Sequence, residues 1–290
     1  MKGLMYRNLK IYFSNKSGVF FSLMGALISF VLYLIFLRQN MVSSWSSVPD
    51  TKLLLDPWLI GGTLTITAIT TTLSSLSLMV QDRGKNTLSD LSLTDVSYLG
   101  IQCSYLLTAM IVGIIMQLVM YFMMGGYFMI ADNSPLEMAI FPQIFGIIVL
   151  SSFIWTAFNL LLLSFVKKID TLGKIGTIVG TASGFLAGVY IPIGMLPTTV
   201  QQFMKYTPAL YNTAIYRNIL MNTQLQHSFK NFPVSVLNSF KDNMGISVKW
   251  GSQILTNQQD SLVILSFAVV ISMVAVLIFR FSRRVVISRA

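Results

Sequence analysis

The chain has 290 residues, of which 54% are hydrophobic and only 10% are charged, and its mean hydropathy is +0.71. A soluble domain is about 25% charged, so this composition argues against a cytoplasmic enzyme, a nucleic-acid-binding protein or a secreted domain. The single cysteine and single histidine, Cys103 and His227, exclude an intramolecular disulfide framework and argue against a Cys/His metal site within one chain. The composition predicts a polytopic membrane protein.

Six apolar stretches are long enough to cross a bilayer. A spanning helix needs about 20 mostly apolar residues, and each stretch lacks Asp, Glu, Lys, Arg and His. The predicted spans are 18–37, 59–80, 104–130, 138–166, 175–191 and 261–279. We therefore predict an all-α polytopic membrane fold, with residues 1–290 forming a single transmembrane domain.

Residues 1–16 mix basic and apolar side chains ahead of the first stretch, and two interpretations remain open. The composition suits a helix lying in the membrane interface, but it also suits a basic flank that only orients the first span. The first stretch itself is longer than the apolar core of a signal peptide, so we interpret it as a retained span.

The basic residues predict the orientation. Of the 20 Lys and Arg residues, thirteen fall on one side of the predicted membrane and seven on the other, five of these within the long segment 192–260. Short basic connections stay in the cytoplasm, which places both termini and residues 81–100 inside and residues 192–260 outside. The net charge of +10 then favours contact with anionic lipid headgroups over nucleic acid.

The second span carries a row of hydroxyl side chains at alternating spacings of four and three residues, which share one helix face. The row consists of Thr63, Thr67, Thr70, Ser74 and Ser77. Such a row can line a polar path, or it can form hydrogen bonds between helices. The sequence leaves both alternatives open.

The predicted fifth span carries glycines at every fourth position: Gly176, Gly180, Gly184 and Gly188. Small residues at this spacing let another helix approach closely in lipid. Whether that helix belongs to the same chain or to a second subunit is undecided. Pro192 and Pro197 then predict a re-entrant turn on the outer side, followed by amphipathic segments at 198–206 and 210–221.

No energy source is evident in the chain. Ion-coupled transporters usually carry ionisable residues inside their spans, and the predicted spans have none. The pairs Gly84-Lys85 and Gly173-Lys174 lack the spacing of a phosphate-binding P-loop. Any uphill transport must therefore draw its energy from another protein.

The order of these parts resembles the ABC-2 family of ABC-exporter permeases. The resemblance lies in Asp82-Arg83-Gly84-Lys85, Leu88, Leu91 and Tyr98-Leu99; in Gly188, Pro192 and Leu196-Pro197; and in Tyr206-Thr207-Pro208 and Tyr216-Arg217. The family more often has Glu where this chain has Gln81-Asp82, and the resemblance thins over 222–260.

The resemblance implies a six-span subunit that pairs with a second permease chain, identical or homologous, and works with separate ABC ATPase subunits that bind ATP and Mg. Residues 81–100 would couple the permease to the ATPase, and the second and fifth spans would line the path. The other expected contacts are membrane lipids, and no cofactor or nucleic acid is expected for this chain. Its expected location is the bacterial cell membrane.

We interpret the chain as the permease subunit of an exporter for a hydrophobic or amphipathic cargo such as a drug, an antimicrobial peptide or a lipid, a role connected with antibiotic resistance. The alternatives are a polysaccharide or teichoic-acid type exporter permease and a non-transporting immunity or scaffold protein. A membrane enzyme is disfavoured, because the ten acidic residues are scattered along the chain.

Overall fold

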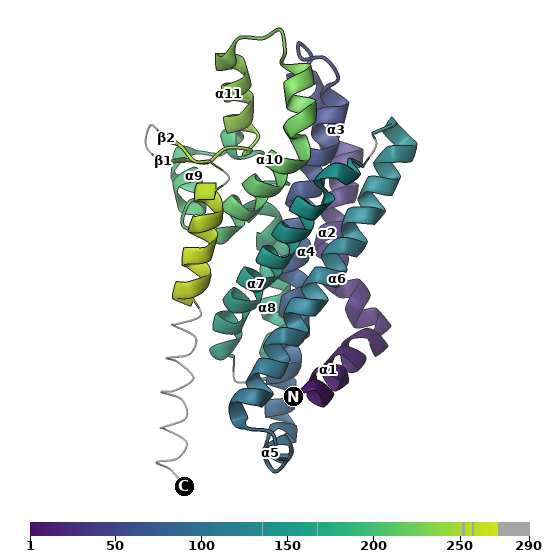
Figure 1. Cartoon of the computed structure of the whole chain (residues 1–290), viewed down its shortest axis with the longest axis vertical. Helices are drawn as coiled ribbons and strands as arrows, with labels where there is room; N and C mark the ends of the chain where they lie inside the picture. Colours follow the sequence, from purple (N-terminus) through teal and green to yellow (C-terminus); the bar gives the residue numbers. More distant parts are fainter. Residues whose placement is uncertain (135, 167, 251–252, 257, 272–290) are drawn as a thin grey trace.

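A computed structural model describes residues 1–134, 136–166, 168–250, 253–256 and 258–271 (Figure 1). The described chain is an elongated helical bundle whose long helices run roughly parallel to one another. The elements are α1 Lys2–Ser14, α2 Lys16–Leu32, a π-helix Tyr33–Leu37, α3 Arg38–Ser44, α4 Thr51–Gly84, α5 Thr87–Ser92, α6 Tyr98–Asp132, a 3-10 helix Met138–Ile140, α7 Phe141–Ser164, α8 Asp170–Leu186, a 3-10 helix Ile193–Met195, α9 Thr198–Met204, α10 Pro208–Ser228, α11 Val234–Asn243 and an apolar helix Gln258–Ile271.

Four helical stretches are long and apolar enough to cross a membrane: Lys16–Ser44, Thr51–Gly84, Tyr98–Asp132 and Met138–Ser164. They contain the first three predicted spans and extend beyond them; in α4, for example, polar residues such as Asp56 and Asp82 continue the helix at both ends. The fourth helix ends at Ser164, short of the predicted end of that span at residue 166. Within the described residues, the sixth predicted span is a helix as far as Ile271, and its remainder lies outside them.

The fifth predicted span, 175–191, has the wrong boundaries. The helix there is α8, which begins at Asp170 and ends at Leu186. It ends early because Gly188 adopts a positive φ of 59°, a conformation that breaks the helix and that glycine tolerates. With 17 residues, α8 is shorter than the roughly 20 residues of a complete crossing.

The centre of the bundle is α4, which packs against α2, α6, α7, α8 and α10. Glycines allow the closest of these approaches. A Cβ on Gly61 would lie 3.1 Å from the backbone nitrogen of Arg217 in α10, and one on Gly62 would overlap Val189. At Gly61, therefore, α4 and α10 approach almost backbone to backbone.

The prediction that 210–221 forms an amphipathic helix at the outer interface is wrong. In α10, Tyr211, Ala214 and Tyr216 are fully buried, and the helix packs against α4 and α7. Its polar side chains are buried because they find partners on those helices: Asn212 Nδ2 donates to Thr65 Oγ1 at 2.9 Å and to Ser151 Oγ at 3.0 Å.

The only strands among the described residues are β1 Lys249–Trp250 and β2 Gln253–Ile254, which pair antiparallel with Lys249 opposite Ile254. Apart from this short hairpin, the described chain is helical, in agreement with the predicted fold class. The hairpin lies near α9 and α11 at the end of the bundle opposite α5 (Figure 1).

Candidate transport groove and coupling contacts

A large groove of about 1010 Å³ runs between α2, α4 and α8. Its walls are formed by apolar, hydroxyl and glycine residues, and among the described residues that line it there is no Asp, Glu, Lys, Arg or His. The predicted site residues that line it are Thr70, Ser74 and Ser77 from α4 and Gly176 and Gly180 from α8. The groove thus brings parts of the two predicted rows together on one surface.

The hydroxyl row divides between the groove and the core. Thr63 and Thr67 are fully buried, and Thr67 Oγ1 donates to the Thr63 carbonyl oxygen at 2.8 Å. Thr70 and Ser77 face the groove while their hydroxyls donate to carbonyls of their own helix, at Ile66 and Ser74. Each groove hydroxyl therefore retains acceptor capacity toward whatever occupies the groove.

Hydrogen bonds between helices fall on hydroxyls outside the predicted row. Asn159 Nδ2 of α7 donates to Thr72 Oγ1 at 2.8 Å, and Thr65 bonds to Asn212 and Thr213 of α10. The sequence left open whether the hydroxyls of α4 line a polar path or form hydrogen bonds between helices, and these two roles fall on different faces of α4. Groove lining involves the C-terminal part of the row, from Thr70 to Ser77, and the hydrogen bonds between helices are made by neighbouring hydroxyls.

The four glycines do not form one ridge. A Cβ on Gly176 or Gly180 would meet no atom within 4 Å, whereas one on Gly184 would overlap the ring of Tyr190. Gly188 lies beyond the helix, in a turn where Val189 N donates to Gly184 O at 3.0 Å. In the described chain, then, the first two glycines have open space where a side chain would stand, although the Gly180 carbonyl oxygen lies close to Gly25 of α2, and the last two glycines shape the turn.

The prolines stand where the re-entrant turn was predicted. Pro192 immediately precedes the 3-10 helix Ile193–Met195, and Pro197 caps the start of α9. Neither has a backbone N–H to donate, which suits positions at the start of a helix.

The turn is held by Arg217, a residue that the sequence indicates only as part of a family motif. Its side chain is 1% exposed, and its guanidinium stacks on Trp58 with Cζ 4.1 Å from the ring centroid. It donates to the carbonyl oxygens of Gly188 (3.0 Å), Ala187 (3.3 Å), Met244 (2.9 Å) and Trp58 (3.3 Å). Burial lowers the pKa of Arg217, and the carbonyl oxygens are the polar partners that surround the guanidinium.

Asp82 of the predicted coupling segment faces inward instead of lying on the surface. It is 5% exposed and accepts a forked pair of hydrogen bonds from Arg7, at 2.8 and 3.2 Å. The Tyr105 hydroxyl donates to the same carboxylate at 2.6 Å. Asp82 therefore joins α1, α4 and α6, and its hydrogen bond raises the pKa of Arg7.

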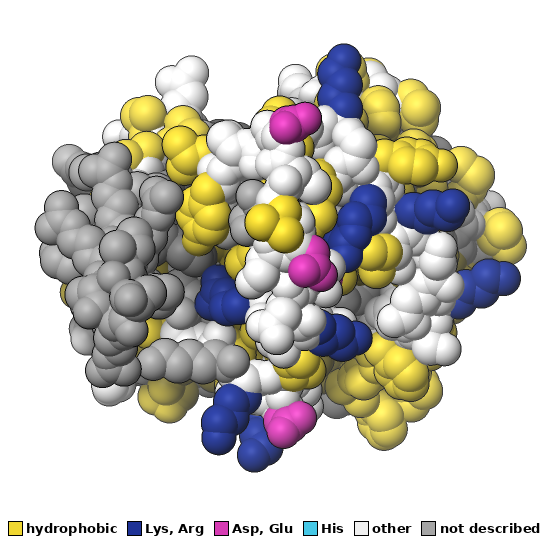
Figure 2. Space-filling model, turned by 90° about the horizontal axis from the view of Figure 1, so that it is seen from below, with side chains coloured by type: hydrophobic (Ala, Val, Ile, Leu, Met, Phe, Trp, Pro, Cys, Tyr) yellow, Lys and Arg dark blue, Asp and Glu magenta, His cyan; other side chains and the backbone are white. Residues whose placement is uncertain are grey.

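The remaining coupling residues form a short projection at this end of the bundle. Asn86 adopts a left-handed conformation that separates α4 from α5, and Gly84 is packed so closely that a Cβ would lie 2.8 Å from Ile169. Leu88 and Leu91 are half-buried against the core, and Arg83 is partly exposed. Lys85, Asp90 and Leu93 are exposed, and Figure 2 shows basic, acidic and hydrophobic side chains mixed on this face.

These features define a multi-pass helical membrane protein with a groove whose described lining is uncharged and with a short segment that projects at one end. A sequence profile of the ABC-2 type transporter family matches residues 1–221. The chain therefore belongs to the ABC-2 type transporter family, in which the permease domain lacks the ATPase, and the predicted resemblance is confirmed. A search of curated proteins found no match.

Proposed function

We propose that this permease domain belongs to an ATP-driven exporter that moves a hydrophobic or amphipathic cargo, such as a drug, an antimicrobial peptide or a lipid, out of a bacterial cell. The observation that carries the proposal is the uncharged lining of the groove between α2, α4 and α8. A polyanionic glycan would lose its hydration there without gaining a cationic partner, a large penalty in a medium of low polarity. The lining therefore favours the amphipathic cargo over a teichoic acid.

A second permease chain, identical or homologous, would complete the groove. Gly176 and Gly180 have open space where a side chain would stand, and exposed apolar residues such as Phe21 and Ile28 lie on α2 beside them. Small residues on one face are the usual means of close helix contact in lipid. This open, apolar side supports a path between two chains.

The energy would come from separate ABC ATPase subunits that bind ATP and Mg at the cytoplasmic face. Asp90 and Leu93 are exposed on α5 and the loop that follows it, and would be available to such a subunit. The Asp82 contact with Arg7 and Tyr105 would carry movement of this segment to α1 and α6. In this arrangement both termini lie in the cytoplasm.

The test is reconstitution of the full chain in vesicles together with the ATPase that purifies with it. We expect ATP-dependent movement of a fluorescent amphipathic dye, and loss of that movement in Thr70→Phe, which fills the groove. Val119→Phe, on an exposed face of α6, serves as the control and should transport normally. Uphill movement by the chain without an ATPase would refute the proposal.

A further inference from the structure

Charged side chains from α3, α4 and α6 meet at the end of the bundle opposite α5 (Figure 1). The Arg38 guanidinium of α3 lies between two carboxylates, with Nη2 at 3.1 Å from Asp56 Oδ1 of α4 and 2.6 Å from Asp132 Oδ2 of α6. The Asp56 side chain has no exposed surface, and the exposed fractions of the Asp132 and Arg38 side chains are 13% and 18%. Two acids therefore share one cation in a place that water hardly reaches.

These three residues stand just outside the predicted spans 18–37, 59–80 and 104–130. The helices continue past those boundaries, so the bundle encloses charges that the apolar stretches themselves do not contain. The junction of three helices therefore depends on how these charges are balanced.

Several polar atoms at this junction lack a partner. Asp56 Oδ2, Arg38 Nε and the Tyr33 hydroxyl are buried and have no hydrogen-bond partner among the described residues. Tyr33 is fully buried beside Trp58, with ring centroids 6.3 Å apart, and its hydroxyl lies within electrostatic range of Arg38, Asp56 and Asp132. We call these four residues, Tyr33, Arg38, Asp56 and Asp132, the charge cluster. An unpartnered carboxylate oxygen is costly in such surroundings, so Asp56 needs a further partner.

The neighbouring elements do not supply a second cation. In the described part of the chain, Arg38 is the cation within ion-pair distance of Asp56. Lys52, one turn earlier on α4, acts on Asp56 from an exposed position, and Arg217 of α10 is held by carbonyl oxygens. Helix α7 contains no titratable side chain, and the lysines of α2 and α8 lie toward the α5 end. The second acid is therefore left without a balancing charge.

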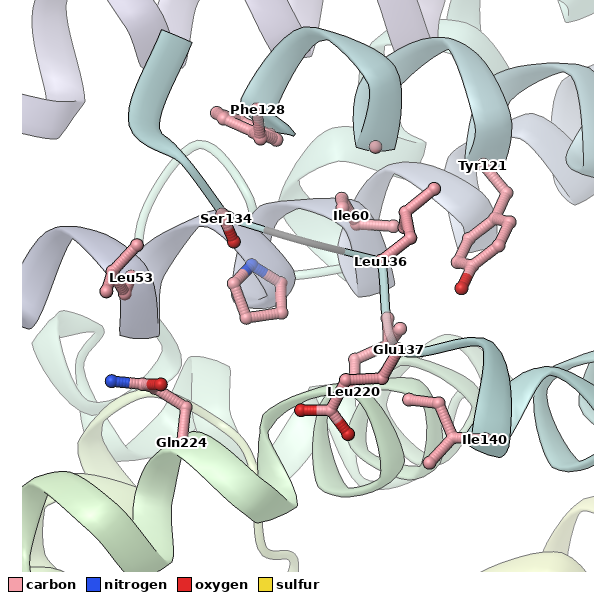
Figure 3. A pocket seen from close by; sticks show the side chains of 12 residues that line it. Leu53, Ile60, Tyr121, Phe128, Ser134, Leu136, Glu137, Ile140, Leu220 and Gln224 are labelled. Carbon is pink, nitrogen blue, oxygen red and sulfur yellow. The ribbon is translucent and has the colours of Figure 1, made fainter. Parts of the chain in front are cut away.

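Two cavities adjoin this end of the bundle. The smaller one, of about 120 Å³, is drawn in Figure 3, and the charge cluster contributes no residue to its lining. The larger one, of about 440 Å³, is lined by Asp132 together with Asp50 and Lys52, both of which are exposed. Asp132 therefore connects the buried cluster to a cavity that opens to solvent.

We propose that the charge cluster binds one proton, carried on Asp56 Oδ2 and exchanged with solvent through the larger cavity. Two carboxylates that share a site hold a proton between them, because like charges so close together are unfavourable. Asp132 stays ionised, since it lies closer to Arg38 and reaches the open cavity. The Tyr33 hydroxyl, which has no other partner, can accept the hydrogen bond of the protonated acid. A metal ion would be repelled by the guanidinium that already lies between the two acids.

The proton ties the stability of this junction to pH. Unfolding exposes Asp56 to water, where a carboxyl group is ionised at neutral pH, so the folded chain holds one proton more than the unfolded chain. Stability therefore falls as the pH rises, and the unfolding equilibrium constant should increase about tenfold per pH unit.

Infrared spectroscopy of the purified full chain at neutral pH tests the proposal directly. The wild-type spectrum minus that of Asp56→Asn should contain the carbonyl stretch of one protonated carboxyl group per chain. Glu137→Gln is the matched control, because Glu137 is a partly exposed acid at the same end of the molecule (Figure 3), and its difference spectrum should contain no such band. Asp132→Asn should also abolish the band, although Asp56 is retained, because Arg38 then balances the one remaining acid.

Unfolding in detergent micelles at a series of pH values provides the second readout. The tenfold increase per pH unit should be lost in Asp56→Asn and kept in Glu137→Gln; the exposed His227 contributes equally to all of these chains. Absence of the band from the wild-type chain, its persistence in Asp132→Asn, or the same pH dependence in wild type and Asp56→Asn would overturn the proposal. Because no ATPase or transport is involved, that failure would leave the exporter proposal intact.

Discussion

The contact between Arg7 and Asp82 joins residues that stand 75 positions apart and fixes the N-terminal helix α1 to the end of the central helix α4. Only 7% of the Asp82 side chain and 30% of the Arg7 side chain is exposed. The forked geometry matches the planar guanidinium to the carboxylate. With little water to compete, this pair holds α1 at one defined place on α4 and α6.

We therefore expect Asp82→Asn and Arg7→Gln to be coupled energetically. A double-mutant cycle measured by unfolding in mixed detergent micelles should give a coupling free energy of about 1–2 kcal/mol. Asp90→Asn, on the exposed face of α5, provides the matched control and should show no coupling with Arg7→Gln. If the effects of the two substitutions on the free energy of unfolding were additive, the coupling free energy would be zero and α1 would be held by its apolar contacts alone.

Arg217 is the second residue on which several elements depend. Its one guanidinium joins α10, the Trp58 ring, the turn after α8 and the Met244 carbonyl. Arg217→Lys keeps a positive charge but loses the planar stacking and two of the five N–H donors. We expect it to lower the free energy of unfolding by about 2–4 kcal/mol.

The measurement is denaturation of the purified chain, with Lys230→Met as the comparison. Lys230 is an exposed basic residue in the same part of the sequence, so its loss should change stability little. If Arg217→Lys were as stable as the wild-type chain, the charge alone, without the geometry of its donors, would account for the fixed turn.

The sequence could indicate which residues matter more readily than it could indicate where they point. Asp82 belongs to the family motif, yet its carboxylate faces inward, because its partner Arg7 lies on a helix whose position no local pattern reveals. The role of Arg217 was missed for the same reason. The signal that could have revealed it was a basic residue in the middle of the segment 210–221, together with the Gly61-Gly62 pair that makes room for it.

At the scale of elements, the length of the apolar stretches was sufficient to predict the first four spans, because burial in lipid depends on composition over about 20 residues. This criterion failed where the chain does not form one continuous helix across the membrane. The positive φ of Gly188 ends α8 early. Interhelical partners such as Thr65 and Ser151 bury a polar helix, α10, that the pattern placed at the membrane surface.

The glycines of α8 provide a test in which two neighbouring positions should behave differently. Gly180 has open space beside it, while Gly184 is covered by Tyr190. We expect Gly180→Leu to fold with wild-type stability and to abolish transport, because its side chain enters the groove. Gly184→Leu should instead destabilise the chain, since the turn must be displaced to make room.

Thermal unfolding and vesicle transport of the two variants separate these effects. Normal transport by Gly180→Leu would remove α8 from the proposed path. A loss of stability equal to that of Gly184→Leu would mean that the Gly180 surface is packed against protein within the same chain.

For the molecule as a whole, the two proposed partner surfaces lie apart. The groove runs along α2, α4 and α8, and the exposed coupling residues lie at the end where α5 projects (Figure 1). A permease that receives energy at one end and moves cargo along its length needs this separation, because the ATPase must bind without covering the path. The two contacts should therefore be separable by mutation.

A triple variant, Lys85→Ser, Asp90→Ser and Leu93→Ser, tests this separation without touching a buried side chain, since all three residues are exposed. Native mass spectrometry of the complex should show loss of the ATPase subunits while two permease chains stay together. The control changes Lys230 and Val234, which are exposed and lie toward the opposite end, and it should keep every subunit. An ATPase that stays bound to the triple variant would place the coupling contact elsewhere, and simultaneous loss of the second permease chain would show that one surface serves both partners.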